Sequence, residues 1–136
     1  MTRVMVDMSA TLIHHGHVRL INAAKEYGAV VVALTTDAEI LSRKGYRPEL
    51  SFDQRKEIIS AVDGVVDVVP CQWLITEDFL NSHNIDYLVH GDDNVNPISK
   101  DRLIVVPRTH GISSTSLRDS AARAIRERKN RKLMLT

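Results

Sequence analysis

The stretch Ile13-His14-His15-Gly16-His17 separates a short apolar run from a helical repeat. Residues 3–7, Arg-Val-Met-Val-Asp, are typical of a buried strand, and apolar side chains recur at helical spacing between His17 and Tyr27, just before Gly28. The histidines therefore lie at a strand-to-helix turn, where the amides and the dipole of a helix N-terminus favour phosphate.

Two of these imidazoles, His14 and His17, can donate hydrogen bonds to charge that grows on a transferring phosphoryl group. Gly16 between them removes the side chain where a phosphate must come close. A single histidine on an apolar face is usually a packed histidine. Three histidines within four residues, around a glycine at a turn, favour a functional site instead.

The rest of the chain alternates strand and helix patterns. Strands are expected at 29–34, 65–69, 87–90 and 103–106, and helices at 37–41, 51–62, 76–83 and from Ser113 or Ser114 onward. Residues 42–50 are expected to form a mobile loop. This alternation predicts an α/β fold, a single Rossmann-like domain with a five-stranded parallel, doubly wound sheet and helices on both faces.

The position of the polar turns agrees with this architecture. In such sheets ligands bind outside the carboxyl ends of the strands, at the point where the strand order reverses. The turns that follow the first, second, fourth and fifth predicted strands all fall at that edge. We expect the domain to span residues 1–120, with 121–136 as a helix end and basic tail, which is more simply a solvated helix end than a nucleic-acid patch.

Composition limits the class of protein. The chain has 136 residues, 43% of them hydrophobic, which suits one compact domain with one core. A net charge of +1 and 4% aromatic residues argue against a nucleic-acid partner. No apolar run of membrane-spanning length and no signal pattern is present, and the single cysteine, Cys71, favours a reducing compartment, so we expect a cytoplasmic protein.

The His-x-Gly-His turn resembles the hallmark of a nucleotidyltransferase superfamily that includes cytidylyltransferases and adenylyltransferases. About ninety residues later, 108–115 read Arg-Thr-His-Gly-Ile-Ser-Ser-Thr, similar to the Arg-Thr-x-Gly-Ile-Ser-[Ser/Thr]-Thr signature of the cytidylyltransferase branch. The resemblance runs from Val4 to about Arg118. It is greatest to glycerol-3-phosphate cytidylyltransferase and to the cytidylyltransferase domains fused to phosphoenolpyruvate mutase in phosphonate biosynthesis.

The resemblance implies roles for individual residues. Catalytic roles are expected for His14, His17, Lys44 and Arg108. Contacts to the nucleotide are expected from Ser9, Ala10, Thr11, Gly16, His90, Asp92, Asp93, Thr109, Gly111, Ile112, Ser113, Ser114 and Thr115. Arg55 and His110 are expected to bind the acceptor. Mg²⁺ is expected to arrive with the triphosphate, so no protein-held metal site is predicted.

Several of these residues also have structural explanations. A charged, glycine-containing loop around Lys44 is by itself more often solvated, and Arg55 could be an exposed helix residue. Residues 113–115 alone would be an ordinary helix cap, with hydroxyls and free amides that could also hold the β- and γ-phosphates. The Gly91-Asp92-Asp93 turn could be a turn and cap or a metal site.

The chain departs from the family pattern at three places. Residues 8–11 are Met-Ser-Ala-Thr instead of Gly-x-Phe-Asp, so Thr11 replaces a carboxylate that could organise metal and phosphates. Met-Ser-Ala also occurs in the phosphonate-associated domains. Asn94 stands where a tryptophan commonly follows the Gly-Asp-Asp turn, and His110 replaces an acid.

These observations predict a cytidylyltransferase. It would transfer CMP from CTP to a small phosphonate or phosphate alcohol, such as 2-hydroxyethylphosphonate or glycerol 3-phosphate, giving a CDP-conjugate and pyrophosphate. A homodimer is expected, with a fused or partner domain as a further possibility. Two alternatives stay open: a degenerate nucleotide-binding or regulatory module without turnover, and an adenylyltransferase that uses ATP.

Overall fold

The computed structural model describes residues 1–135. In chain order its elements are β1 (Arg3–Met8), α1 (His15–Lys25), β2 (Ala29–Thr35), α2 (Asp37–Lys44), α3 (Phe52–Ser60), β3 (Val65–Cys71), α4 (Glu77–Ser82), β4 (Tyr87–His90), the 3₁₀-helix η1 (Lys100–Arg102), β5 (Leu103–Val105) and α5 (Ser114–Leu135). Every strand and helix expected from the sequence has a counterpart in this order.

The five strands form one parallel sheet in the order β3-β2-β1-β4-β5. The chain builds outward from β1 to β3 on one side, and then returns to add β4 and β5 on the other. The strand order therefore reverses between β1 and β4, and Met5 pairs with Leu88 across that junction. The predicted five-stranded, doubly wound α/β fold is confirmed.

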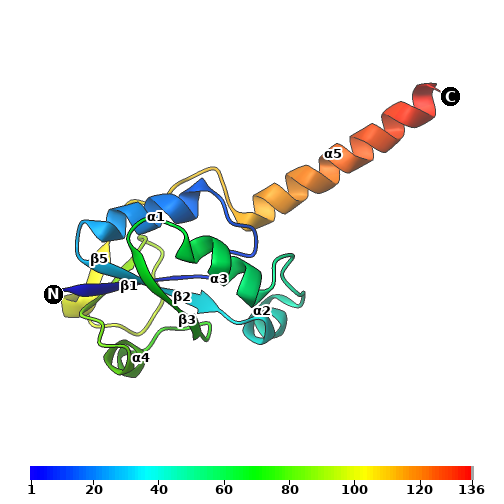
Figure 1. Ribbon diagram of the computed structural model, residues 1–136. Helices are drawn as coiled ribbons and strands as arrows, with labels where there is room; N and C mark the ends of the chain where they lie inside the picture. The colour runs from blue at the N-terminus through cyan, green and yellow to red at the C-terminus, as the bar shows by residue number, and fades with distance from the viewer. Residues whose placement is uncertain (136) are drawn as a thin grey trace.

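Apolar side chains cover both faces of the sheet. On one face, Ile21 and Ala24 of α1 and Ile59 of α3 pack over alternate residues of β1 and β2. On the other face, Leu80 of α4 packs over Met5 and the opposite alternation of β2. Figure 1 shows α1 and α3 on one side of the sheet and α4 on the other. This double cover explains why β2 is an uninterrupted apolar run.

Helix α2 is longer than predicted. It begins after Thr36, whose Oγ1 accepts the N–H of Glu39, and it continues through Lys44. It ends where Gly45 takes a left-handed conformation with φ of 78°. The expectation of a loop from Ser42 onward is therefore wrong, because polar helix formers carry the helix to a glycine cap. The loop between α2 and α3 consists of residues 45–51.

Helix α5 crosses the expected boundary between residues 120 and 121 without a break. It leaves the body of the domain at its N-terminal end and extends into solvent (Figure 1). Arg123, Arg126 and Arg128 are exposed on it, as expected for a solvated helix. Within residues 1–135, no helix combines the length and apolar character needed to cross a membrane.

Candidate active site

A cavity of about 330 Å³ opens at the carboxyl ends of β1 and β4, where the strand order reverses. It is lined by Asp7, Met8, Ser9, Ala10, Thr11, His14, Gly16, His17, Leu20, Lys44, His90, Gly91, Asp93, Pro107, Arg108, Thr109, Ile112, Ser113, Ser114 and Thr115. The fold thus brings together most of the residues expected from the two motifs. Asp92, Gly111, His110 and Arg55 do not line the cavity.

The two motif histidines fix each other's orientation at the start of α1. The backbone N–H of Gly16 donates to Nδ1 of His14 at 3.1 Å, and the backbone N–H of His14 donates to Nδ1 of His17 at 3.1 Å. Because both Nδ1 atoms accept, a neutral ring must carry its proton on Nε2. Each imidazole is therefore held as an Nε2–H donor at the wall of the cavity.

The electrostatics of the site keep both rings neutral. Burial lowers the pKa of His17 to about 4, and the neighbouring His14 adds to this shift. Burial also lowers the pKa of His14, with a further contribution from His15. The two ring centroids are 4.0 Å apart, so two imidazolium charges would repel strongly. At neutral pH the two rings are therefore hydrogen-bond donors that carry no positive charge.

Gly16 is required by the histidine pair as well as by an incoming phosphate. A Cβ atom at this position would lie 2.8 Å from Cε1 and 3.0 Å from Nδ1 of His14. The ring of His14 can accept from the N–H of residue 16 only when that residue has no side chain. The spacing of the motif therefore follows from the local geometry of the turn.

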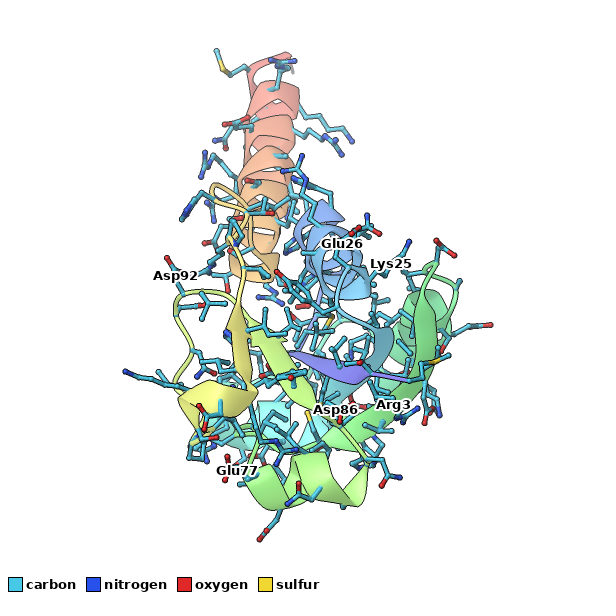
Figure 2. The ribbon with its side chains drawn as sticks, turned by 90° about the vertical axis from the view of Figure 1, so that its left-hand side faces the viewer. Arg3, Lys25, Glu26, Glu77, Asp86 and Asp92 are labelled. Atoms are coloured by element: carbon cyan, nitrogen blue, oxygen red, sulfur yellow. The ribbon has the colours of Figure 1, made fainter. Side chains whose placement is uncertain are left out.

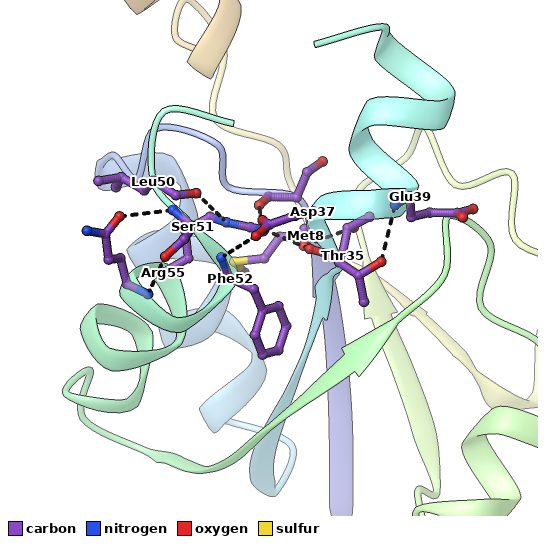
Figure 3. A network of polar contacts seen from close by, with 11 residues as sticks. Met8, Thr35, Asp37, Glu39, Leu50, Ser51, Phe52 and Arg55 are labelled. Atoms are coloured by element: carbon purple, nitrogen blue, oxygen red, sulfur yellow. Dashed lines mark hydrogen bonds and ion pairs between the residues drawn. The ribbon is translucent and has the colours of Figure 1, made fainter. Parts of the chain in front are cut away.

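Arg55 of α3 holds the turn between β1 and α1 in place. Its Nη1 donates to the carbonyls of Ser9 at 2.6 Å and Thr35 at 2.9 Å, and its Nη2 pairs with Oδ1 of Asp37 at 2.6 Å. Nε donates to the carbonyl of Leu50 (Figure 3). The side chain is fully buried. The structure thus places Arg55 outside the cavity, where it holds the turn, and its contact with an acceptor stays a prediction.

The turn itself is strained at Ala10, whose φ is 48°. Few non-glycine residues adopt this left-handed conformation, and such outliers concentrate at functional sites. Ala10 lines the cavity, and the carbonyl before it, that of Ser9, is one of the groups that Arg55 holds. Arg55 therefore maintains the strained turn from which the wall of the cavity is built.

Helix α5 begins at the opposite wall. Oγ of Ser113 accepts the N–H of Ser116 at 3.0 Å and caps the helix. Oγ of Ser114 accepts the N–H of Leu12 at 3.0 Å and donates to the carbonyl of Leu12 at 2.8 Å. Ser114 thus ties α5 to the turn after β1, and the helix N-terminus faces the same cavity as the histidines. This is a favourable place for phosphate oxygens.

A row of polar side chains lines one part of the cavity. Oδ1 of Asp7 lies 3.5 Å from Nε2 of His90, and Nδ1 of His90 lies 3.6 Å from Oδ1 of Asp93. The other oxygen of Asp93 accepts from Nη1 of Arg108 at 3.0 Å. The predicted residues His90, Asp93 and Arg108 thus lie next to one another, and Asp93 and Arg108 form an ion pair.

Asp7 was missed by the sequence analysis, which treated it as the end of a strand. Burial raises the pKa of its carboxyl group, although His90 opposes the shift. Within the described residues, its buried Oδ1 has no hydrogen-bond partner. A polar residue at the last positions of an apolar strand, at a ligand-binding edge, is the signal that could have identified it.

Lys44 lines the cavity from the last turn of α2. Its Nζ lies 5.6 Å from the ring centroid of Trp73, so the ammonium group rests over an aromatic face. The left-handed Gly45 follows directly. The lysine therefore lies at the rim of the cavity, at the end of a helix.

Three expected residues lie elsewhere. Asp92 and His110 are exposed, and Asp92 points away from the body of the domain (Figure 2). Gly111 has a φ of 81°, and open space surrounds the position of a Cβ. Glycine is favoured at this position because the turn before α5 needs a residue with left-handed backbone conformation. Their contacts to nucleotide or acceptor stay predictions.

The site has few carboxylates that could hold a metal. Among residues 1–135, no group of three histidine, cysteine or acidic side chains is arranged for a metal ion. Mg²⁺ commonly keeps its waters and binds through substrate phosphates with one or two carboxylates. Asp7 and Asp93 in the cavity fit that limited demand.

The cavity lies where the strand order of the parallel sheet reverses. Two neutral imidazoles line it at the start of α1, and the N-terminus of α5 lies opposite them. This arrangement is suited to nucleotidyl transfer. The comparisons agree: the chain belongs to the cytidylyltransferase-like family, which matches residues 9–120. The resemblance found in the sequence is thereby confirmed, and the expected class of enzyme, a CTP-dependent nucleotidyltransferase, is supported.

Individual relatives carry two kinds of name. A glycerol-3-phosphate cytidylyltransferase of Bacillus subtilis is 35% identical, over 90% of this chain and 98% of the relative. An ethanolamine-phosphate cytidylyltransferase of Arabidopsis thaliana is 32% identical, over 93% of this chain and 34% of the relative. The chain thus spans about a third of the relatives named for ethanolamine phosphate.

A solved structure shows the same fold. The lipopolysaccharide core biosynthesis protein from Thermoplasma volcanium GSS1 matches with a TM-score of 0.66 and 16% identity, over 80% of this chain and 98% of that chain. At this level of identity, the similarity concerns the architecture and not the substrate.

Proposed function

We propose that the protein transfers CMP from CTP to the phosphate or phosphonate group of a small alcohol, releasing pyrophosphate. The observation that carries the proposal is the reciprocal hydrogen bonding of His14 and His17, which presents two neutral Nε2–H donors to one cavity. Such donors stabilise the charge of a phosphoryl transition state without needing a change in protonation.

In the proposed reaction an oxygen of the acceptor attacks the α-phosphorus of CTP. A new P–O–P bond forms, the bond between the α-phosphorus and its bridging oxygen breaks, and pyrophosphate leaves with the electron pair. His14 and His17 donate to the α-phosphate, while the N-terminus of α5 and Lys44 hold the leaving phosphates. Arg108 supplies a cation beside them. No covalent intermediate with the protein is required.

We propose that Mg²⁺ enters bound to CTP, and that Asp93 is the carboxylate of the cavity that would help to hold it. Its chemistry would be to neutralise charge on the triphosphate. The residues described above orient the phosphates and donate hydrogen bonds around it.

A specific observation favours an acceptor with a positive group. Asp7 presents a buried carboxylate oxygen to the cavity that has no hydrogen-bond partner among residues 1–135, although Nε2 of His90 lies 3.5 Å from it. Carboxylates repel the phosphates of an acceptor, but they would bind an ammonium group at its other end. Among the acceptors in the relatives' names, ethanolamine phosphate carries such a group and glycerol 3-phosphate does not.

The test is a matrix of four acceptors that varies one group at a time. Glycerol 3-phosphate, ethanolamine phosphate, 2-hydroxyethylphosphonate and 2-aminoethylphosphonate would each be supplied with CTP and Mg²⁺, and pyrophosphate release would be measured. We expect turnover that is higher with the two amines. Equal or higher kcat/KM with the two hydroxyl compounds would contradict the proposed binding of an ammonium group by Asp7. The acceptor proposed would then be glycerol 3-phosphate or 2-hydroxyethylphosphonate.

The alternatives are separated in the same assay. ATP in place of CTP identifies an adenylyltransferase if it supports equal turnover. CTP binding without turnover on any acceptor identifies a degenerate module, and a large gain on Thr11→Asp would then show that the lost carboxylate is responsible. The homodimer, the partner domain and the cytoplasmic location stay predictions from the sequence.

A further inference from the structure

Arg118, in the second turn of α5, contacts two distant parts of the chain. Its Nε and Nη2 donate to the two carboxylate oxygens of Glu49 at 2.5 and 2.7 Å. Nη1 donates to the hydroxyl of Tyr46 at 3.3 Å, and the guanidinium carbon lies 4.7 Å from the centroid of the Tyr46 ring. Nη2 also donates to Oγ1 of Thr11 at 3.1 Å.

These partners belong to the segments that build the cavity. Thr11 is a buried residue of the turn after β1 and lines the cavity. Tyr46 and Glu49 lie in the α2–α3 loop (residues 45–51), which begins immediately after Lys44. Arg118 itself lies four residues after Ser114, whose hydroxyl ties α5 to Leu12. One guanidinium group thus connects the loop that follows Lys44 to the two walls of the cavity.

The geometry is that of a directed contact. The planar fork of arginine matches both oxygens of one carboxylate, and the hydrogen bond from Arg118 is the main cause that lowers the pKa of Glu49. The Arg118 side chain retains 28% exposure and Glu49 41%, so the pair is reached by water and adds little to stability. Its effect is to fix where the loop lies.

Thr11 is an uncharged partner of Arg118. A threonine hydroxyl accepts one hydrogen bond without charge, so the charge of Arg118 is directed to the carboxylate of Glu49. An acid at position 11 would compete for the same guanidinium group. The residue that replaces the family's aspartate therefore leaves Arg118 free to hold the loop.

We propose that Arg118 is a positioning residue, which holds the α2–α3 loop against the cavity through Glu49 and Tyr46 and so keeps Lys44 in place for the triphosphate. This inference rests on the proposed use of CTP. It extends that function by coupling the site of phosphate binding on α5 to the loop on the opposite rim. Loss of the coupling would weaken CTP binding more than it slows the chemical step.

The first test needs no activity. Chymotrypsin cleavage after Tyr46 would be timed by mass spectrometry in the ligand-free protein, for wild type, Arg118→Gln, Glu49→Gln and the exposed control Arg123→Gln. We expect roughly tenfold faster cleavage in the first two variants and no change in the control. Because Glu49→Gln leaves α5 intact, it separates loop release from damage to the helix. Equal cleavage rates in all four proteins would overturn the proposal.

The second test measures the consequence for the reaction. We expect Arg118→Gln and Glu49→Gln to raise KM for CTP roughly tenfold, with KM for the acceptor and the melting temperature nearly unchanged. Arg118→Lys should recover part of the effect, because it keeps the charge and loses the fork. A fall in kcat alone, or an unchanged KM for CTP despite faster cleavage, would overturn the link to Lys44.

Absence of turnover on every acceptor in wild type would instead contradict the proposed function. In that case CTP binding, measured by calorimetry, replaces KM in the same set of variants. Weaker binding in Arg118→Gln and Glu49→Gln would still support the positioning role, and unchanged binding would overturn it.

Discussion

The backbone N–H of His14 donates to Nδ1 of His17 at 3.1 Å, so the second histidine of the motif is oriented by the backbone of the first. The arrangement resembles a reciprocal helix cap made of two imidazoles, since His14 in turn accepts from Gly16. Local backbone groups thereby set the tautomer of the groups proposed to meet the α-phosphate. Neither ring can rotate without leaving an amide of the first turn of α1 unpaired.

Replacing His17 with alanine removes one of these donors. We expect kcat/KM for CTP to fall about 10²–10³-fold, as for the loss of one transition-state donor. His15→Ala is the matched control, because His15 lies between the two histidines in sequence, is exposed and does not line the cavity. Comparable losses in the two variants, measured by pyrophosphate release, would argue against a specific role for His17.

The lowered pKa of His17 predicts a dependence of stability on pH. The ordinary value is 6.5 and the folded value is about 4, so the unfolded chain binds the proton first as the pH falls. The free energy of unfolding should therefore be highest above pH 6.5. It should fall as the pH is lowered toward 4, and the total loss due to His17 should be about 3 kcal/mol.

Urea unfolding of wild type and His17→Gln between pH 7.5 and 5 measures that contribution as a difference. We expect the free energy of unfolding of the wild type to fall more steeply than that of the variant. Parallel curves would mean that His17 is not kept neutral by burial.

The raised pKa of Asp7 predicts the opposite dependence of the free energy of unfolding on pH. The unfolded chain ionises first as the pH rises above 3.8, so the free energy of unfolding falls as the pH rises from there toward the higher pKa of the folded protein. Asp7→Asn should therefore raise the free energy of unfolding by about 1 kcal/mol at pH 7 and leave it unchanged near pH 4. The same variant should lose the proposed preference for amine acceptors. A less stable variant at pH 7 would contradict this account.

Arg55→Met tests whether that arginine holds the turn after β1 or contacts the substrate. Removing it leaves the carbonyls of Ser9 and Thr35 without their donor, and we expect a loss of about 3 kcal/mol in the free energy of unfolding. Lys56→Met is the control, since Lys56 is an exposed neighbour on α3. A variant with normal stability and a much higher KM for the acceptor would instead indicate that Arg55 contacts the acceptor.

The sheet and the histidine turn could be predicted because their signals are local. Apolar runs, the glycine after the first helix and the His-x-Gly-His spacing each act within a few residues. Such patterns also place the turns at one edge of a parallel sheet. The family resemblance then added the second motif, 108–115, of which Arg108, Thr109, Ile112 and all of 113–115 line the cavity.

The errors concern residues whose environment depends on distant parts of the chain. Arg55 is buried because a carbonyl of the turn after β1 and a carbonyl of β2 converge on it, which no pattern within α3 reveals. Asp7 and Arg118 were missed for the same reason. The end of α2 was misjudged although Gly45 marked it, because a run of charged residues was interpreted as loop.

The contacts of α5 also determine when the cavity can exist. The bonds from Ser114 to Leu12 and from Arg118 to Thr11 join residues 102 and 107 positions apart. During synthesis the turn with the histidines leaves the ribosome before its opposite wall does. The binding site is consequently completed late, after the parallel sheet has brought its strands together.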